Sequence, residues 1–295
     1  MKISARKTKN PLQRSKHEIK KRKKKRSMRY HHLTTILAVS CLLLVLLWTV
    51  LYTVSPGPPR FESFTAQEIP KLIIQTYHDL SKIPKKVHDN IKDFAPEYRR
   101  DVYSDRDCLA FLRKFYGEDA EHTFSSLKGA HKADFFRYCA LYMFGGVYLD
   151  IKSELILPLK DVFTKKNCLY TVISIVKGTI YQGVIATPPR NPLFLRLIAF
   201  MIDIVKHKRN YKYMTFTTDF YTKIKEDTGC TLSTLKEGFL QNVNTGGIDY
   251  FLFQEKCTRN SSHCKDGLDR YGYCCNIFRG KKKLMKTRYS DFPWK

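Results

Sequence analysis

The sequence predicts an α/β fold with a largely parallel sheet, preceded by a single transmembrane helix. From residue 69 onward, β-branched and aromatic runs alternate with segments of helical periodicity. Within this part, the pair Gly145-Gly146 separates a helical pattern from an apolar strand pattern. Ahead of it, residues 33–54 form a run of 22 residues without a charge. At about 1.5 Å per residue, such a run crosses a hydrocarbon core of about 30 Å.

The positive charge of the chain is concentrated at its start. Residues 1–32 hold 14 Lys and Arg against the single Glu18, which is half of the formal net charge of +26. A basic run directly before an apolar span is the topology signal of the positive-inside rule. A cleaved signal peptide, the alternative, usually has an apolar region of about 7–15 residues. We therefore expect a basic cytosolic tail over 1–32, a retained signal anchor over 33–54, and no nucleic-acid partner.

The rest of the chain is expected on the lumenal side of the Golgi or ER membrane, in a single-pass type II arrangement. Residues 55–68 are rich in proline and polar residues and have little periodicity, which is typical of a short stem. No internal repeat is evident beyond them. One lumenal domain over 69–295 is the simplest partition.

Eight cysteines follow the anchor, an even number that is compatible with disulfides in an oxidising compartment. Zinc is the alternative for the group near the carboxyl terminus, but its spacing matches no paired CxxC template. That group is Cys257, His263, Cys264, Cys274 and Cys275. Disulfides are favoured, with no partners assigned. In the same segment, Asn260 begins an Asn-Ser-Ser glycosylation sequon.

Local patterns place the regular elements. Before the glycine pair, strands are expected over 71–77 and 101–104, and helices over 85–94 and from an Asp105 cap to Tyr116. After it, residues 168–176 and 179–187 predict a hairpin or two neighbouring strands. Helices are then expected from Pro192 (capped by Asn191) to Val205 and over 218–227. The remainder, 228–295, has the composition of loops.

The corner around the glycine pair brings charged groups together. The pattern of 130–144 is helical, and Asp134 and Arg137 are three residues apart, so that their side chains are neighbours; a surface ion pair alone would explain them. In a strand over 147–152, alternate residues share a face. Val147, Leu149 and Ile151 then point into the core, whereas Tyr148, Asp150 and Lys152 point the other way. A carboxylate at the carboxyl end of a buried α/β strand lies where ligands usually bind.

The segment ADFFRYCALYMFGGVYLD, with IPKLIIQTY upstream of it, resembles glycosyltransferase family 32, whose sugar transferases carry a DXD motif. Members include initiating α-1,6-mannosyltransferases, mannosylinositol-phosphoceramide synthases and lumenal α-1,4-glycosyltransferases. The resemblance implies a Rossmann-like GT-A fold, a UDP- or GDP-sugar donor, Mn²⁺ or another divalent metal, and transfer with retention of anomeric configuration.

The resemblance also implies roles for individual residues. Asp134 matches the aspartate that contacts the donor sugar hydroxyls, and Arg137 matches the arginine beside the sugar and phosphates. Tyr148 would lie along the nucleotide, and Asp150 is the first aspartate of the motif, near the ribose and metal. The backbone of Ile74, Gln75 and Thr76 would line the nucleoside pocket. Weaker resemblances cover 182–186, with Gln182 where the family often has Asn, and either 217–219 or 245–247.

Lys152 occupies the position of the second DXD aspartate. An ammonium group cannot coordinate a metal ion and repels one beside it. Three alternatives remain open. Glu154 could replace the missing ligand and hold a metal with Asp150, if the strand continues. Lys152 could itself stabilise the departing diphosphate, with Asp150 and Lys152 as the catalytic pair. The third is a site without activity.

The sequence thus predicts a type II membrane glycosyltransferase. It would transfer a hexose from a nucleotide sugar to a glycan, glycoprotein or glycolipid acceptor, with retention. The alternative is a catalytically silent lumenal protein on the same scaffold, which binds a glycan or a partner protein.

Overall fold

The computed structural model describes residues 40, 67–245, 247–259 and 273–288. The chain divides into two compact units, 1–64 and 65–295, of which the second contains the fold described below. The predictions for the tail, for the anchor apart from Ser40, for most of the stem, and for Asn260, His263 and Cys264 lie outside the described residues. Within the described part of the chain, no helix is long and apolar enough to cross a bilayer.

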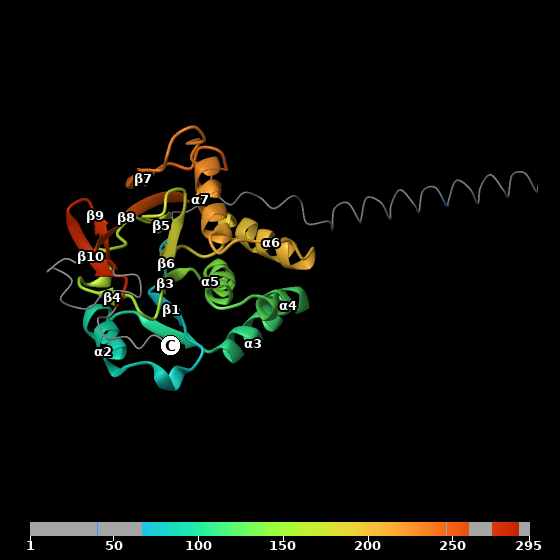
Figure 1. Ribbon diagram of the computed structural model, residues 1–295, viewed down its shortest axis with the longest axis horizontal. Helices are drawn as coiled ribbons and strands as arrows, with labels where there is room; N and C mark the ends of the chain where they lie inside the picture. Colours follow the sequence, from blue (N-terminus) through green and yellow to red (C-terminus); the bar gives the residue numbers. More distant parts are fainter. Residues whose placement is uncertain (1–39, 41–66, 246, 260–272, 289–295) are drawn as a thin grey trace, which may run out of the picture. The chain divides into compact units, whose positions relative to one another are not determined.

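The described strands form one mixed sheet (Figure 1). Its order is β2 (Arg99–Tyr103), β1 (Leu72–Thr76), β3 (Gly146–Leu149), β6 (Ile180–Thr187), β5 (Cys168–Ile173), β8 (Asp249–Arg259), β9 (Tyr273–Arg279), β10 (Lys282–Lys286) and β4 (Glu154–Leu155), with β7 (Gly238–Leu240) paired to β8. Among these strands, β1 is parallel to β2 and β3, and β5 is parallel to β8. The other six pairings are antiparallel.

The prediction of an α/β fold is therefore confirmed, but that of a largely parallel sheet is wrong. Parallel neighbours need long crossovers, whereas antiparallel ones can follow directly along the chain. The connection at Lys177-Gly178 turns β5 straight back into β6 as a hairpin, as expected. The prediction of loops over 228–295 is also wrong, because this segment supplies β7 to β10. Its frequent lysines and cysteines hide the alternation by which strands are recognised.

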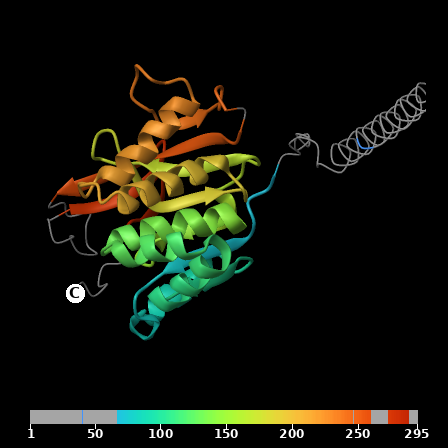
Figure 2. The ribbon, with the colours of Figure 1, turned by 90° about the vertical axis from the view of Figure 1, so that its right-hand side faces the viewer.

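Helices cover both faces of the sheet. On one face lie α3 (Asp105–Tyr116), α4 (Glu118–Ser126), α5 (Ala130–Phe144), α6 (Pro192–Lys206) and α7 (Thr215–Asp227). Figure 2 shows them stacked in front of the sheet, from teal α3 to orange α7. On the other face lies α2 (Lys85–Phe94), and short 3₁₀ helices occupy Leu80–Lys82 and Leu159–Asp161.

Most helix boundaries agree with the expectations, with three differences. The cap of α3 is Ser104, whose side chain forms a reciprocal capping box with Asp107, and not Asp105. Helix α4, which directly follows α3, was not predicted. Helix α7 begins at Thr215, three residues before its predicted start. The predicted Asn191 cap of α6 is confirmed, since its side chain accepts from the backbone of Leu193.

Strand β3 ends earlier than predicted. Its last ladder partner is Leu149, after which Asp150 donates its N–H to Gly183 O at 2.8 Å. The chain then turns, with Ser153 N–H donating to Asp150 O at 2.8 Å. Lys152 therefore lies in a turn and not on the strand face of Tyr148. Both faces of β3 are core: Val147 and Leu149 pack on the α2 side, and Tyr148 packs on the α5 side.

A disulfide joins Cys257 of β8 to Cys275 of β9, which lie directly opposite each other in the antiparallel register. The preference for disulfides over zinc is confirmed for this pair. Elsewhere in the described chain, Cys108, Cys139 and Cys168 are buried thiols. Burial raises the pKa of Cys168 to about 12, so this thiol stays protonated and unreactive.

Replacing Cys257 and Cys275 together with serine is expected to lower the free energy of unfolding by about 3 kcal/mol. The bridged residues are 18 apart in sequence, and closing a loop of that size removes conformational freedom from the unfolded chain. Thermal and urea unfolding of the oxidised full-length protein measure the difference. Cys230→Ser, which removes a partly buried thiol, is the control. Equal stability of the double variant and the native protein would contradict the prediction.

Candidate functional site

The candidate site lies at one edge of the sheet, where the carboxyl ends of three parallel strands meet. Strands β1, β2 and β3 run in the same direction, so Thr76, Tyr103 and Leu149 reach the same edge. Because β6 runs antiparallel to β3, its amino-terminal residues adjoin that edge. Helix α5 leads back into β3 through two glycines, so the amino-terminal half of α5 lies over the edge. This topology brings Asp134 and Arg137 to Asp150.

Arg137 is at the centre of the site. Its Nη2 lies 3.2 Å from Asp134 Oδ1 and 3.5 Å from Asp150 Oδ1. Its guanidinium carbon is 4.3 Å from the centre of the Tyr148 ring, in a cation–π contact. The structure therefore brings these four residues together, and the role of each residue stays a prediction.

The guanidinium is buried, and its charge is compensated within the site. Only 4% of Arg137 is exposed. Burial disfavours the charged form, but the Tyr148 phenol and the carboxylates of Asp134 and Asp150 outweigh it and hold the pKa of Arg137 above its ordinary value. Burial likewise raises the pKa of Tyr148, whose hydroxyl is 3.0 Å from Thr76 Oγ1. The site thus holds a permanent cation in a desolvated position.

Gln182 of β6 closes the site on the side of α6 and α7. Its backbone oxygen accepts a short hydrogen bond from Arg137 Nη1, and its Oε1 accepts from the Tyr138 hydroxyl at 2.7 Å. Its Nε2 is buried and has no hydrogen-bond partner among the described residues. A buried unsatisfied donor is costly, and a ligand oxygen would satisfy it. Sequence reasoning did not single out Tyr138.

The three residues predicted for the nucleoside pocket do not all lie on the same face of β1. Thr76 lies on the side of Tyr148 and reaches the site. The side chain of Ile74 belongs to the core between the sheet and α5. Gln75 is fully buried, and its Oε1 accepts from Arg100 Nε at 2.6 Å, on β2. A contact of this segment with a nucleoside through its backbone stays a prediction.

Glu154 does not lie where a metal ligand was expected. It begins β4, and its Oε2 pairs with Lys286 Nζ of β10 at 3.2 Å. The premise of that alternative, a strand that continues past Lys152, is wrong because the chain turns after Asp150.

Glu255 of β8 is a second buried carboxylate at this edge, and sequence reasoning missed it because β8 was not recognised. It is 7% exposed and accepts from Ser174 Oγ at 2.9 Å and from Ile175 N–H at 3.2 Å. Burial raises the pKa of Glu255, although these two hydrogen bonds and the charge of Lys152 oppose the shift. Lys152 therefore lies within electrostatic reach of Glu255.

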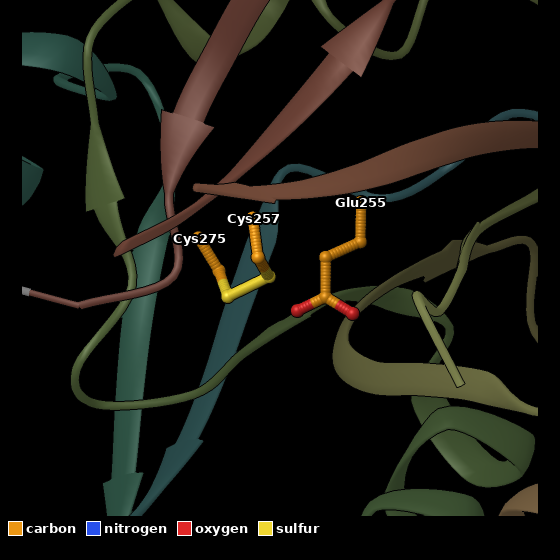
Figure 3. A group of neighbouring side chains, drawn as sticks. All are labelled: Glu255, Cys257 and Cys275. Carbon is orange, nitrogen blue, oxygen red and sulfur yellow. A yellow bond between two sulfur atoms is a disulfide. The ribbon is translucent and has the colours of Figure 1, made fainter. Parts of the chain in front are cut away.

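The available ligands do not fit a divalent metal at Asp150. Within the described chain, three ligand-type side chains converge only at Glu255, Cys257 and Cys275 (Figure 3), and both sulfurs are oxidised there. A disulfide offers no thiolate ligand. Asp150 pairs with Arg137 and is followed by Lys152, so the site offers cations where a metal would need anionic oxygens.

His131 at the start of α5 also belongs to the site and was missed. Its Nδ1 lies 3.1 Å from Asp134 Oδ2, so Asp134 is held by Arg137 on one oxygen and by His131 on the other. The imidazole packs against the rings of Tyr211, Tyr213 and Phe216. Its position three residues before Asp134 on a helix is the signal that could have found it.

Residues 85–169 match the family described as "Glycosyltransferase sugar-binding region containing DXD motif". The match runs from the start of α2 into β5. The matched residues include Asp134, Arg137, Tyr148 and Asp150, and the predicted resemblance to glycosyltransferase family 32 is confirmed.

Curated relatives carry mannosyl transfer in their names. The chain is 27% identical over 203 residues to "Initiation-specific alpha-1,6-mannosyltransferase" of Candida albicans, covering 64% of this chain and 51% of the relative. It is 28% identical over 170 residues to "Mannosyl phosphorylinositol ceramide synthase SUR1" of Saccharomyces cerevisiae, covering 55% and 40%. The chain thus spans about half or less of the length of these relatives. Among solved structures, "PaToxG Glycosyltransferase" aligns with 13% identity and a TM-score of 0.43, over 56% of this chain and 74% of that one.

Proposed function

We propose that this protein is a glycosyltransferase that moves a hexose from a UDP- or GDP-sugar to a glycan, glycoprotein or glycolipid acceptor, with retention of configuration. The observation that carries the proposal is the burial of Arg137 between Asp134 and Asp150 at the carboxyl edge of β1 and β3, inside the region that matches the sugar-binding family. We further propose a GT-A-like fold, and a type II arrangement in the Golgi or ER membrane through residues 33–54. The names of the relatives favour mannose as the hexose.

The chemistry of transfer requires positive charge beside the leaving group. When the bond between the sugar C1 and the diphosphate breaks, negative charge develops on the phosphate oxygens. Arg137 is already desolvated and fixed by Asp134, so it stabilises this charge without reorganising at the moment of reaction. Asp134 binds sugar hydroxyls, and Tyr148 lies along the nucleotide. The acceptor hydroxyl attacks from the face that the diphosphate leaves, and the departing phosphate takes its proton.

Lys152 is proposed to supply a second positive charge to the departing diphosphate. It follows Asp150 in the turn at the sheet edge, and the buried carboxylate of Glu255 lies within its electrostatic reach. The proposal therefore needs no metal-binding carboxylate.

Lys152→Asp, which restores the DXD pattern, is expected to make the reaction depend on Mn²⁺. The native protein should hydrolyse its donor sugar equally in EDTA and in Mn²⁺, since a lysine charge does not depend on added metal. The Lys152→Asp variant should hydrolyse the donor about a hundredfold more slowly in EDTA and should regain this activity in Mn²⁺. Lys152→Arg, which keeps the charge, is the control. Loss of native activity in EDTA would contradict the role of Lys152.

A panel of UDP- and GDP-sugars tests the proposed function itself. The full-length protein in detergent is heated with each donor, and the donor that raises its Tm is then tested for hydrolysis and transfer. A stabilising donor that is turned over supports an enzyme. A stabilising donor without turnover in any condition would support the catalytically silent alternative instead.

A further inference from the structure

A continuous row of contacts leads from the buried donor end of the site to the protein surface. It begins at Tyr148, whose ring is in cation–π contact with Arg137. It then passes through the ion pair of Arg137 with Asp134. It continues through the hydrogen bond between His131 and Asp134 to an aromatic group beyond His131. His131 is only 8% exposed, so the row is closed to solvent until it reaches those aromatic rings.

The aromatic group is supplied by the connection between α6 and α7 and by the start of α7. The ring centres of Tyr211, Tyr213 and Phe216 lie 5.5, 5.4 and 4.9 Å from that of His131. Tyr211 and Phe216 also contact each other, with centres 5.1 Å apart. Phe216 is buried, whereas Tyr213 is 70% exposed. The group therefore has an apolar base and one ring that faces solvent.

We infer that Tyr213 is a platform for a sugar ring of the acceptor. The C–H bonds on one face of a pyranose form an apolar patch, and an aromatic ring offers a rigid surface of matching size with little loss of conformational entropy. The phenol hydroxyl can hydrogen-bond the sugar's own hydroxyls. This inference rests on the proposed function for the identity of its ligand as an acceptor.

The position of Tyr213 distinguishes it from an aromatic residue that is exposed by chance. Single exposed apolar side chains are normal on protein surfaces. Tyr213, however, touches His131, which in turn holds the carboxylate proposed to bind the donor sugar. An acceptor must lie beside the donor sugar for its hydroxyl to attack C1. The other exposed apolar pair near this edge, Ile175 and Val176, has no ring on which a sugar could stack.

Direct binding tests the platform without relying on transfer. Saturation-transfer NMR is recorded on the full-length protein in detergent, with methyl α-mannopyranoside and methyl β-galactopyranoside as probes and no donor present. We expect ring-proton signals from at least one glycoside with the native protein and with Tyr213→Phe. Tyr213→Ala should reduce them about tenfold. Phe239→Ala, which removes an exposed ring on β7, should change nothing.

Kinetics provide the second readout, with the same glycosides as acceptors. Tyr213→Ala is expected to raise the acceptor KM about tenfold and to leave the donor KM nearly unchanged, whereas Tyr213→Phe keeps both. If Tyr213 only supported the fold, Tyr213→Ala would change the acceptor KM and the donor KM together. Equal acceptor binding by Tyr213→Ala and the native protein would overturn the platform, and so would the absence of binding to every probe.

The two proposals fail separately. If the glycosides bind through Tyr213 but no donor is hydrolysed, the proposed transferase fails and the platform stands as a glycan-binding site. If donor sugars are hydrolysed but acceptor binding is the same in Tyr213→Ala as in the native protein, the platform fails and the transferase stands.

Discussion

The Asp150→Asn variant is expected to lose sugar transfer by about a hundredfold or more while its fold stays intact. Asparagine has the same shape but no charge, so the carboxylate opposite Arg137 disappears from the donor site. The backbone of residue 150 keeps its place, because its N–H donates to Gly183 O and its oxygen accepts from Ser153 N–H, both at 2.8 Å. Arg137 also keeps Asp134 at 3.2 Å, so no buried charge is left without a partner.

The measurement is donor hydrolysis and transfer by native and variant full-length protein, alongside thermal unfolding of both. Asp150 has a side chain 21% exposed, so its neutralisation should move the Tm little. Glu121→Gln is the matched control: it also neutralises a carboxylate that pairs with an arginine, but it lies on α4 beside Arg113, away from the site. Unchanged donor turnover in Asp150→Asn would remove the basis of the assignment.

The Gly145→Ala variant is expected to be less stable than the native protein by about 2–6 kcal/mol, a large part of the total stability of a domain. Gly145 has φ +62° and ψ −156°, a region essentially restricted to glycine, which costs a side-chain-bearing residue about 1–3 kcal/mol. A Cβ atom there would also lie 2.5 Å from Pro189 N and 2.8 Å from Pro188 C, which are backbone atoms of the segment before α6. That segment must shift, which adds about 1–3 kcal/mol.

A second glycine separates the two causes. Gly280 has nearly the same angle, φ +60°, but a Cβ atom there meets nothing within 4 Å. Gly280→Ala should therefore lower the free energy of unfolding only by the cost of the backbone conformation, about 1–2 kcal/mol. Urea unfolding of both variants measures the difference. Equal losses would show that close packing against Pro188 and Pro189 contributes nothing. Because Gly145 joins α5 to β3, any partly folded variant should also lose donor binding.

Most of the candidate site that depends on one continuous stretch was predictable, although His131 and Tyr138 in that stretch were missed. Asp134, Arg137, Tyr148 and Asp150 lie within 17 residues, and local rules for a helix, a glycine turn and a strand suffice to place them near each other. The same rules fail from Asp150 onward, because β3 already ends at Leu149. Continuation of a strand depends on its ladder partner, and β6 offers none to Lys152, so Glu154 was misplaced.

Several residues of the site come from distant parts of the chain. Gln182, Tyr213 and Glu255 reach the site from β6, from the connection before α7 and from β8. Each looks ordinary in sequence, and only the strand order β3-β6-β5-β8 and the packing of α7 near α5 bring them to one edge. Spatial proximity between segments separated by 40 to 120 residues leaves no local periodicity to detect.

By itself, the sequence determined the α/β class, the corner from α5 into β3 and the identity of its charged residues. These follow from backbone geometry and side-chain spacing over one or two turns. The tertiary structure alone decided the mixed direction of the sheet, the turn that carries Lys152, the pairing of Glu154 with Lys286 and the buried position of Arg137 between two carboxylates. Those features depend on which distant segments pack together, and the burial that follows sets the electrostatics of the site.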